Sequence, residues 1–217
     1  MAAKLTEIEA RVVGALVEKQ LTTPEYYPLT INDLVQACNQ KTNREPVVSY
    51  DEAIVQKSVD DLREKNLVYV FYGSTSRVPK YKHILPDALE LAPPETAVLC
   101  VLMLRGAQTL GELRERTSRL YEFSGLGEVS ETLDNLMRRD EPFVVKLERQ
   151  LGQKEVRYAH LLSGEVIQTA NVSAETSISK RQAENERIET LEREVENLKT
   201  ETAELRQMFE DFKKQFE

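Results

Sequence analysis

The chain has 217 residues, of which 41% are hydrophobic and 30% are charged, a balance typical of a soluble globular protein. Its net charge of −8 opposes non-specific binding to nucleic acid or to an anionic membrane by the protein as a whole. Half of this excess lies in residues 171–217, which carry −4, whereas residues 1–90 and 91–170 each carry −2. The two body segments are therefore close to neutral.

The sequence predicts a cytoplasmic protein without a disulfide. Its first residues contain no apolar signal core, and the longest apolar run, Ala97–Leu104, is too short to cross a bilayer. The two cysteines, Cys38 and Cys100, lie far apart and lack the spacing of metal ligands. Buried free thiols in a reducing compartment are therefore favoured over a disulfide.

Capping patterns and apolar spacing predict three helices at the start of the chain. In four segments a hydroxyl residue is followed three positions later by an acid, which is the pattern that caps a helix N-terminus. The four hydroxyl residues are Thr6, Thr30, Ser49 and Thr109. The first helix is expected to bury one face, formed by Ile8, Val12, Ala15 and Leu16. A short second helix is expected from about Thr30 to Cys38, and a third, with Val55, Val59 and Leu62 on one stripe, is expected to end near Asn66.

The spacing of apolar residues then changes from that of a helix to that of a strand. Residues 67–72 are rich in β-branched and aromatic side chains, Gly73 begins a turn, and residues 77–81 continue as a second strand. Pro79 suits an edge strand or a strand end. The pattern predicts a β-hairpin after the third helix.

The same order of patterns recurs in the second part of the chain. Pro93 and Pro94 open a helix that continues to about Leu104. The segment from Thr109 to Leu113 then mirrors the one from Thr30 to Leu34. The apolar stripe of the third helix is repeated by Val129, Leu133 and Leu136. Strands are expected at 143–147 and 156–161 around Gly152, and both second strands end in a basic residue, Tyr, any residue and His. Recurrence of this kind indicates two copies of one unit.

Three helices followed by a two-stranded wing describe a winged helix-turn-helix. The predicted fold class is therefore mainly α with small β-hairpins (α+β), arranged as tandem winged helix-turn-helix domains with a C-terminal coiled-coil helix. The expected divisions are winged-helix domains at 1–88 and 89–163, a flexible linker at 164–186 and the coiled-coil helix at 187–217.

The predicted coiled-coil helix carries a heptad pattern that favours a homodimer. The seam is formed by apolar residues at the a and d positions, namely Ile188, Leu191, Val195, Leu198, Leu205, Phe209 and Phe212. β-Branched residues at the first two a sites and Leu at d favour two parallel strands, and the flanking charges of such a pair attract. The alternative is a single amphipathic helix that folds back onto its own chain.

The sequence lacks the motifs of an enzyme or of a metal site. It contains no Gly-rich phosphate loop, no H-E-x-x-H, no G-x-S-x-G and no cluster of Cys and His. The two imidazoles, His83 and His160, fall at the ends of predicted strands, where packing or hydrogen bonding is their expected role. We therefore expect no catalytic residues, no metal, no cofactor, no small-molecule substrate and no membrane partner.

The distribution of charge bears on whether the protein binds DNA. A winged helix usually inserts its third helix into the DNA major groove, but residues 51–65 and 126–137 are acidic here. The candidate binding surface instead comprises polar and basic residues in three groups. These are Asn39, Gln40, Lys41, Asn43 and Arg44 before the third helix; Arg105, Arg114, Arg116 and Arg119; and Lys146, Arg149, Lys154 and Arg157 in the second wing. Ordinary solvated surface is the alternative explanation of these charges.

Three long stretches, 37–47, 104–114 and 157–166, resemble the bacterial YceH-like family of proteins of unknown function. The likeness covers nearly the whole chain, although Leu151 stands where a proline is expected, which affects only the second wing turn. The resemblance implies a tandem winged-helix fold and implies no assigned activity. It also directs attention to residues 39–44, whose polar side chains either hold a partner or brace the loop internally.

Two hypotheses follow from the sequence. The first is a non-enzymatic, dimeric DNA-associated regulator that uses the arginine group and the second wing. The second is a protein-protein interaction adaptor that uses winged helices and the coiled coil and does not bind DNA. The fold favours the first hypothesis, and the acidic third helices favour the second.

Overall fold

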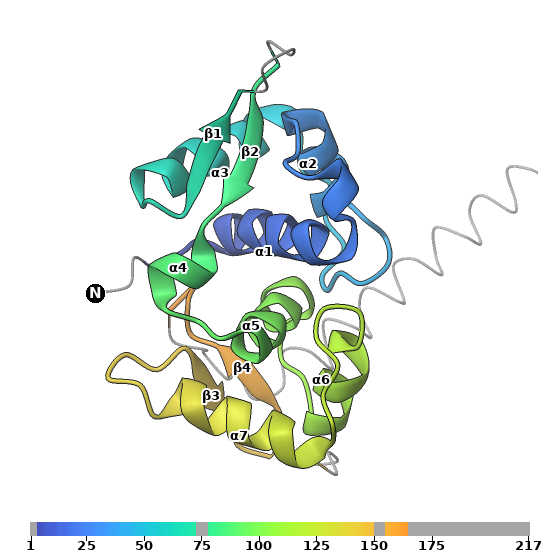
Figure 1. The fold of residues 1–217 in the computed structure, drawn as a ribbon, viewed down its shortest axis with the longest axis vertical. Coiled ribbons are helices and arrows are strands. Elements are labelled where there is room, and N and C mark those ends of the chain that lie inside the picture. Colours follow the sequence, from blue (N-terminus) through green and yellow to red (C-terminus); the bar gives the residue numbers. More distant parts are fainter. Residues whose placement is uncertain (1–3, 73–77, 150–154, 165–217) are drawn as a thin grey trace, which may run out of the picture. The chain divides into compact units, whose positions relative to one another are not determined.

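A computed structural model describes residues 4–72, 78–149 and 155–164, and over these ranges the chain is mainly helical with two small antiparallel hairpins (Figure 1). The described elements are α1 (Glu7–Thr22), a 3-10 turn η1 (Pro24–Tyr26), α2 (Ile31–Cys38), α3 (Glu52–Glu64), β1 (Val68–Phe71), β2 (Lys80–His83), α4 (Leu85–Leu89), α5 (Pro93–Arg105), α6 (Leu110–Thr117), α7 (Leu126–Met137), β3 (Val144–Lys146) and β4 (Tyr158–His160). This order confirms the predicted α+β class. The predicted coiled-coil helix and nearly all of the predicted linker lie outside the described residues.

Three of the four predicted N-terminal caps are confirmed. Thr6, Thr30 and Thr109 each accept a hydrogen bond from the backbone N–H three residues on, and the acid at that position bonds back to the cap N–H. The prediction for Ser49 is wrong, because α3 begins two residues later. Its cap is Asp51, whose carboxylate accepts from Ile54 N–H at 2.8 Å.

Both hairpins pair as predicted, with His83 opposite Val68 and His160 opposite Val144. In each half, the residue preceding the cap of the second helix adds a bridge to the second strand. Leu29 exchanges backbone hydrogen bonds with Tyr81 at 2.7 and 3.3 Å, and Gln108 does so with Tyr158 at 2.7 and 3.0 Å. The entry to α2 and the entry to α6 are therefore fixed to their hairpins by the same contact.

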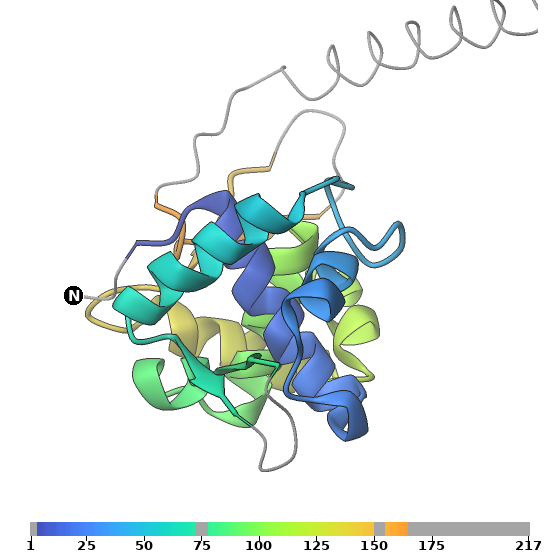
Figure 2. The same ribbon diagram turned by 90° about the horizontal axis from the view of Figure 1, so that it is seen from above.

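Helices α1 and α5 pack against each other at the centre of the described residues (Figure 1). The side chains of α1 are buried from Glu9 to Val17, and those of α5 from Glu95 to Leu104. The predicted face of α1 is buried at Val12, Ala15 and Leu16. The burial extends beyond this face, because α2 and α3 cover one side of the helix and α5 covers another (Figure 2). A Cβ at Gly14 would lie 3.2 Å from Met103 Cβ, so glycine permits this close approach.

The two halves share one continuous hydrophobic core. Buried residues from α1, α2 and α3 form a single cluster with those from α5, α6 and α7. Cys38 and Cys100 are both buried free thiols, as predicted, and Cys100 Sγ lies 3.5 Å from the Gly14 carbonyl oxygen. The short helix α4, which was not predicted, connects β2 to α5. The first half is therefore connected to the second by α4 and a few flanking residues, without a long linker.

Candidate functional site

The segment between α2 and α3 is held in place by its own polar residues. Asn39 follows α2 and exchanges two hydrogen bonds with the backbone of Tyr50, at 2.7 and 2.8 Å, which closes the loop. Asn43 adopts a left-handed conformation with φ of 61°, which asparagine tolerates better than most residues. Asn39 therefore has the bracing role that side-chain-to-backbone bonds perform in turns.

Arg44 lies beneath the loop and is only 4% exposed. Its guanidinium binds both carboxylate oxygens of Glu18, at 2.6 and 3.0 Å, and donates to the Ala37 carbonyl. A bidentate pair of this kind is the strong form of an ion pair. Arg44 therefore connects the loop to α1 and contributes nothing to an exposed surface.

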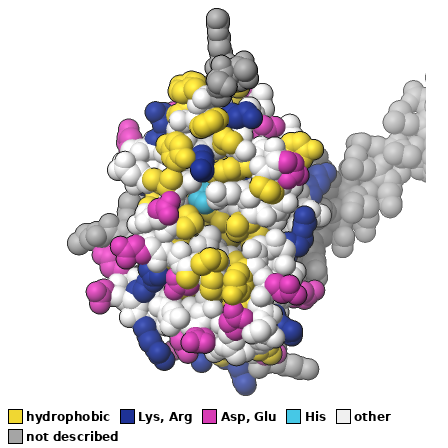
Figure 3. Space-filling model, in the orientation of Figure 1, with side chains coloured by type: hydrophobic (Ala, Val, Ile, Leu, Met, Phe, Trp, Pro, Cys, Tyr) yellow, Lys and Arg dark blue, Asp and Glu magenta, His cyan; other side chains and the backbone are white. Residues whose placement is uncertain are grey.

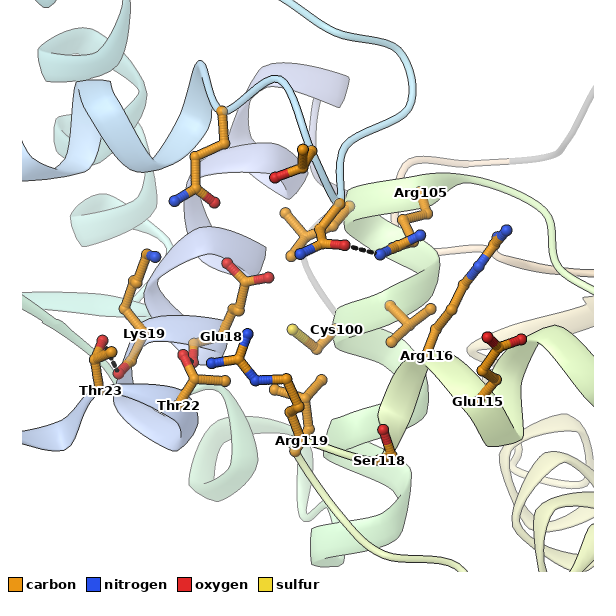
Figure 4. Close-up of a pocket in the computed structure, with 16 residues that line it drawn as sticks. Glu18, Lys19, Thr22, Thr23, Cys100, Arg105, Glu115, Arg116, Ser118 and Arg119 are labelled. Carbon is orange, nitrogen blue, oxygen red and sulfur yellow. Dashed lines mark hydrogen bonds between the residues drawn. The ribbon is translucent and has the colours of Figure 1, made fainter.

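A pocket of about 560 Å³ opens between the C-terminal part of α1, this loop, α5 and α6 (Figure 4). Its wall carries four cationic side chains and two carboxylates. The cations are Lys19, Arg105, Arg116 and Arg119, and the carboxylates are Glu18 and Glu115. Because Glu18 is already neutralised by the buried Arg44, the pocket has an excess of positive charge. We call it the basic pocket.

The cations reach the basic pocket from both halves of the chain. In Figure 4, the side chain of Arg119 extends into the pocket toward Glu18, whereas Arg105 and Arg116 lie together on the other side. Arg105 donates to the side-chain oxygen of Asn43, so the loop and the end of α5 are directly connected. The backbone adds a second connection, because Glu45 N–H donates to the Leu104 carbonyl at 2.9 Å.

Arg105 lies among both cations and carboxylates. Burial lowers its pKa from the ordinary value, and the neighbouring guanidinium of Arg116 lowers that pKa further, whereas the carboxylate of Glu18 raises it in part. Two cations in one pocket favour an anion between them, because each destabilises the charged form of the other. The basic pocket therefore has the electrostatics of an anion site.

Arg116 is also part of a second polar network. It donates to the side-chain oxygen of Gln108, and it lies 3.3 Å from Glu112. Gln108 is buried, and its amide donates to three carbonyls at the end of α5, including that of Arg105 at 3.0 Å. Arg157 joins this network through the Ala107 carbonyl at 2.8 Å and through Glu112 at 3.6 Å. This network fixes the position of α6 relative to α5.

The structure brings together some of the predicted site residues and separates others. Gln40, Asn43, Arg105, Arg116 and Arg119 line the basic pocket. Lys41 and Arg114 are exposed outside its lining, and Lys146 and Arg149 are exposed on the second hairpin and after it. Lys154 lies outside the described residues. The first two predicted groups therefore converge in part. Of the described second-wing residues, Arg157 joins the Gln108 network, and Lys146 and Arg149 do not line the pocket.

Sequence reasoning missed Lys19 and Glu18, both on α1. Their position in the last turns of that helix was visible, but nothing in the sequence indicated that α6 would lie opposite. The surfaces of α3 and α7 carry exposed acids, including Glu52, Glu64 and Glu131, as the charge pattern predicted. Among the described residues, no three His, Cys, Asp or Glu side chains gather as a metal site would require. In the same part of the chain, no helix combines the length and apolar character needed to cross a membrane.

Comparison with known proteins places these features in a family without an assigned activity. The family model described as "Protein of unknown function, DUF480" matches residues 5–153. The chain is 49% identical over 216 residues to a UPF0502 protein of Pelobacter propionicus, with 98% of each chain covered. It is 56% identical over 163 residues to a UPF0502 protein of Opitutus terrae, covering 75% of this chain and 71% of the relative.

The resemblance to YceH-like proteins is confirmed. The UPF0502 protein YceH of Escherichia fergusonii is 48% identical over 201 residues, which is 90% of this chain and 93% of the relative. The chain therefore belongs to the uncharacterised DUF480 family, whose relatives are named UPF0502 proteins.

Proposed function

We propose that the protein is a non-enzymatic, tandem winged-helix, DNA-associated regulator that contacts the phosphate backbone through the basic pocket. The convergence of cations from both halves at this pocket carries the proposal. Phosphate contacts supply most of the affinity of a nucleic-acid-binding protein, and they need Lys and Arg that converge on one surface. The basic pocket provides such a surface although the whole chain is acidic.

The repeated order of elements supports the winged-helix assignment. Each half runs through three helices into a hairpin, and each hairpin receives one bridge from the residue before the cap of the second helix. Three helices followed by a two-stranded hairpin, with a single bridge to the start of the second helix, support a winged helix in each half. In this family of folds the third helix commonly enters the major groove, yet the acids on α3 and α7 oppose that here. The basic pocket is accordingly proposed to position the protein along the backbone without reading bases.

Salt-dependent binding to a random-sequence duplex tests this proposal. Fluorescence anisotropy at about 50 mM and about 200 mM salt should give weaker binding at the higher concentration. The double variant Lys19→Gln, Arg119→Gln should bind more weakly and reduce the salt slope by about 2, since each phosphate contact contributes about 0.9. Arg138→Gln is the control, because the side chain of Arg138, the residue that follows α7, is 78% exposed and lies outside the pocket.

Two results would overturn the DNA proposal. One is the absence of detectable binding at low salt. The other is an equal loss of binding in Arg138→Gln and in the pocket variant, which would show that general surface charge produces the signal.

A second candidate function, a protein-interaction adaptor, is favoured by exposed apolar side chains on the first hairpin. Tyr69, Phe71, Tyr72 and Val78 are between 38% and 68% exposed. Figure 3 shows hydrophobic side chains gathered on the face that carries this hairpin. A contiguous exposed apolar patch is characteristic of a site that binds another protein.

The adaptor function predicts that a partner depends on this hairpin patch. A pull-down with the wild-type chain should recover a reproducible partner that the variant Phe71→Ser, Tyr72→Ser loses. Leu126→Ser is the control, because Leu126 is also exposed but lies on α7. Recovery of the same partner by all three proteins would exclude the patch, and recovery of none, with or without residues 187–217, would count against the adaptor function.

The heptad pattern of residues 187–217 supports a homodimer in either case. The variant Leu198→Asp would place a carboxylate in the proposed seam, where a parallel pair of helices requires an apolar residue. Light scattering should then give half the mass of the wild-type protein. An unchanged mass would contradict dimerisation through this segment.

A further inference from the structure

A second cavity, of about 460 Å³, lies between the two halves. It is bordered by the N-terminal part of α1, the C-terminal part of α5, the segment from Glu45 to Tyr50, and the residues from Ala159 to Gly164. The loop after α2 borders both cavities, because Asn43 lines the basic pocket and Glu45 lines the second cavity. Its volume falls within the range of small-molecule sites.

A buried guanidinium without a carboxylate partner lines this cavity. Arg11 is only 4% exposed, and its hydrogen bonds go to two backbone carbonyls, those of Pro46 at 2.7 Å and Cys38 at 3.4 Å. Within residues 4–72, 78–149 and 155–164, no carboxylate lies within ion-pair distance of it. Arg44, by contrast, is buried against Glu18. Burial lowers the pKa of Arg11, and the carboxylate of Glu45, beyond ion-pair distance, offsets this only in part. A buried charge without an ion-pair partner is costly, so Arg11 is poised to receive an anionic group.

Two residues that line the cavity, His160 and Ser163, each carry a buried polar atom without a partner. His160 Nδ1 and Ser163 Oγ are buried, and neither makes a hydrogen bond within the described residues. In the first half, Nδ1 of His83 accepts from Leu85 N–H at 3.3 Å, and it is the Nε2 atom of that ring, outside this cavity, that lacks a partner. Buried polar groups are normally paired, so two such atoms in residues that border the same cavity as Arg11 point to a ligand.

The remaining walls restrict the chemistry of that ligand. Ala10, Leu102 and Met103 supply an apolar surface, whereas Glu7 and Glu45 are exposed carboxylates at the same cavity. These two acids would repel a phosphate dianion, and they would attract an ammonium group. The cavity therefore combines donors for a carboxylate, acceptors for an amine and apolar side chains.

We propose that this cavity binds a free α-amino acid with an apolar side chain. Arg11, Ser163 and His160 hold its carboxylate, Glu7 and Glu45 attract its ammonium group, and Leu102 and Met103 contact its side chain. The proposal goes beyond DNA association, since it assigns the protein a small-molecule ligand. The same loop borders this cavity and the basic pocket, so an occupied cavity is in position to influence the pocket.

Isothermal titration calorimetry with the full chain tests the proposal, with L-leucine and L-methionine as probes. Two analogues dissect the recognition: 4-methylpentanoate lacks the amine of leucine, and 3-methylbutylamine lacks the carboxylate. We expect saturable binding of at least one amino acid, weaker binding of 4-methylpentanoate and no binding of the amine. Equal affinity for leucine and 4-methylpentanoate would overturn the assignment to an amino acid, and absence of binding by both amino acids would overturn the site.

Two variants locate the binding on the molecule. Ser163→Ala should weaken binding about tenfold, because a hydrogen bond to a charged group is lost. Ser118→Ala is the matched control, since Ser118 lines the basic pocket and its loss should leave binding unchanged. Arg11→Lys should abolish binding while circular dichroism reports an unchanged helix content. If Arg11→Lys unfolds, the comparison of Ser163→Ala with Ser118→Ala still tests the proposal. Equal affinities of wild type and Ser163→Ala would place the ligand elsewhere and overturn the proposal.

Discussion

The first half of the described chain, from α1 to β2, and the second half, from α5 to β4, use equivalent contacts with different residues. The acid at the third position of α1, Glu9, is buried against Lys65 after α3, with oxygen-to-nitrogen distances of 2.6 and 2.7 Å. The acid at the third position of α5, Glu95, contacts Arg139 after α7 at 2.9 Å. In both halves, a buried acid therefore ties the start of the first helix to the end of the third.

The halves differ where they meet. Thirteen residues, 39–51, separate α2 from α3, whereas eight residues, 118–125, separate α6 from α7. The longer segment contributes Asn43 to the basic pocket and Glu45 to the second cavity, and the shorter one contributes Arg119. The repeated contacts therefore build the framework, and the longer segment after α2 adds residues to both cavities.

The largest expected effect comes from core truncation at equivalent positions. Leu62→Ala in α3 and Leu136→Ala in α7 should each lower the free energy of unfolding by about 3 kcal/mol, because both leucines are fully buried. Since the halves share one core, calorimetry should show a single transition that shifts as a whole in either variant. Two transitions, of which only one moves, would show that the halves unfold independently. Val47→Ala, at an exposed position, is the control.

The two buried ion pairs should respond unequally to the same change. Lys65→Met leaves the carboxylate of Glu9 buried with only its cap contacts, and should cost about 2 kcal/mol. Arg139→Met should cost more, about 3 kcal/mol, because Arg139 also donates to two carbonyls, those of Leu89 and Glu90, whereas Lys65 donates to one, that of Lys4.

Urea unfolding of these variants checks the prediction. Arg63→Met is the control, since its pair with Asp60 is about half exposed and should contribute little. An equal cost at Lys65 and Arg139 would show that the two carbonyl contacts of Arg139 do not stabilise the second half.

Acid should destabilise both halves through their histidines. Burial lowers the pKa of His83 from 6.5 to about 4, with a further contribution from Lys82, and burial alone lowers that of His160 to about 4. The unfolded chain therefore binds more protons between about pH 6.5 and pH 4, so stability is full above this window and falls as the pH drops through it. Between about pH 7.5 and pH 5, each histidine should account for a loss of about 2 kcal/mol in the free energy of unfolding.

His83→Leu and His160→Leu isolate the two contributions, whatever each does to stability at neutral pH. Each variant should lose less stability on acidification than the wild type, as measured by urea unfolding at both pH values. If both variants lose as much free energy of unfolding on acidification as the wild type, the acid sensitivity belongs to other groups. Glu9 is one such group, because its contacts with Lys65 and Thr6 outweigh its burial and lower its pKa, which adds a loss at more acidic pH.

The smallest expected effects are at the helix caps. Thr30→Ala and Thr109→Ala should each cost about 1 kcal/mol, because each removes the hydroxyl that accepts from a free N–H at a helix start. Ser49→Ala should leave the free energy of unfolding unchanged, whereas Asp51→Ala should cost as much as the threonine variants. A lower free energy of unfolding in Ser49→Ala, without a change in Asp51→Ala, would show that α3 begins after Ser49 and not after Asp51.

Local features of the sequence were sufficient to predict most of the elements. The caps at Thr6, Thr30 and Thr109, the stripes on the third helices and both hairpins were predicted, because each depends on residues a few positions apart. Ser49 failed as a cap because Asp51 satisfies the same pattern closer to the helix. The short helix α4 has no clear apolar period and was missed.

Only the tertiary structure decided which polar residues lie on the surface and which lie inside. Arg44 and Arg11 look like exposed loop and helix cations in the sequence, yet both are buried, because α5 of the second half covers the region where α1 meets the loop. The sequence by itself determined the repeated elements and their apolar faces. The two cavities depend on contacts between residues more than fifty positions apart, which no local pattern encodes.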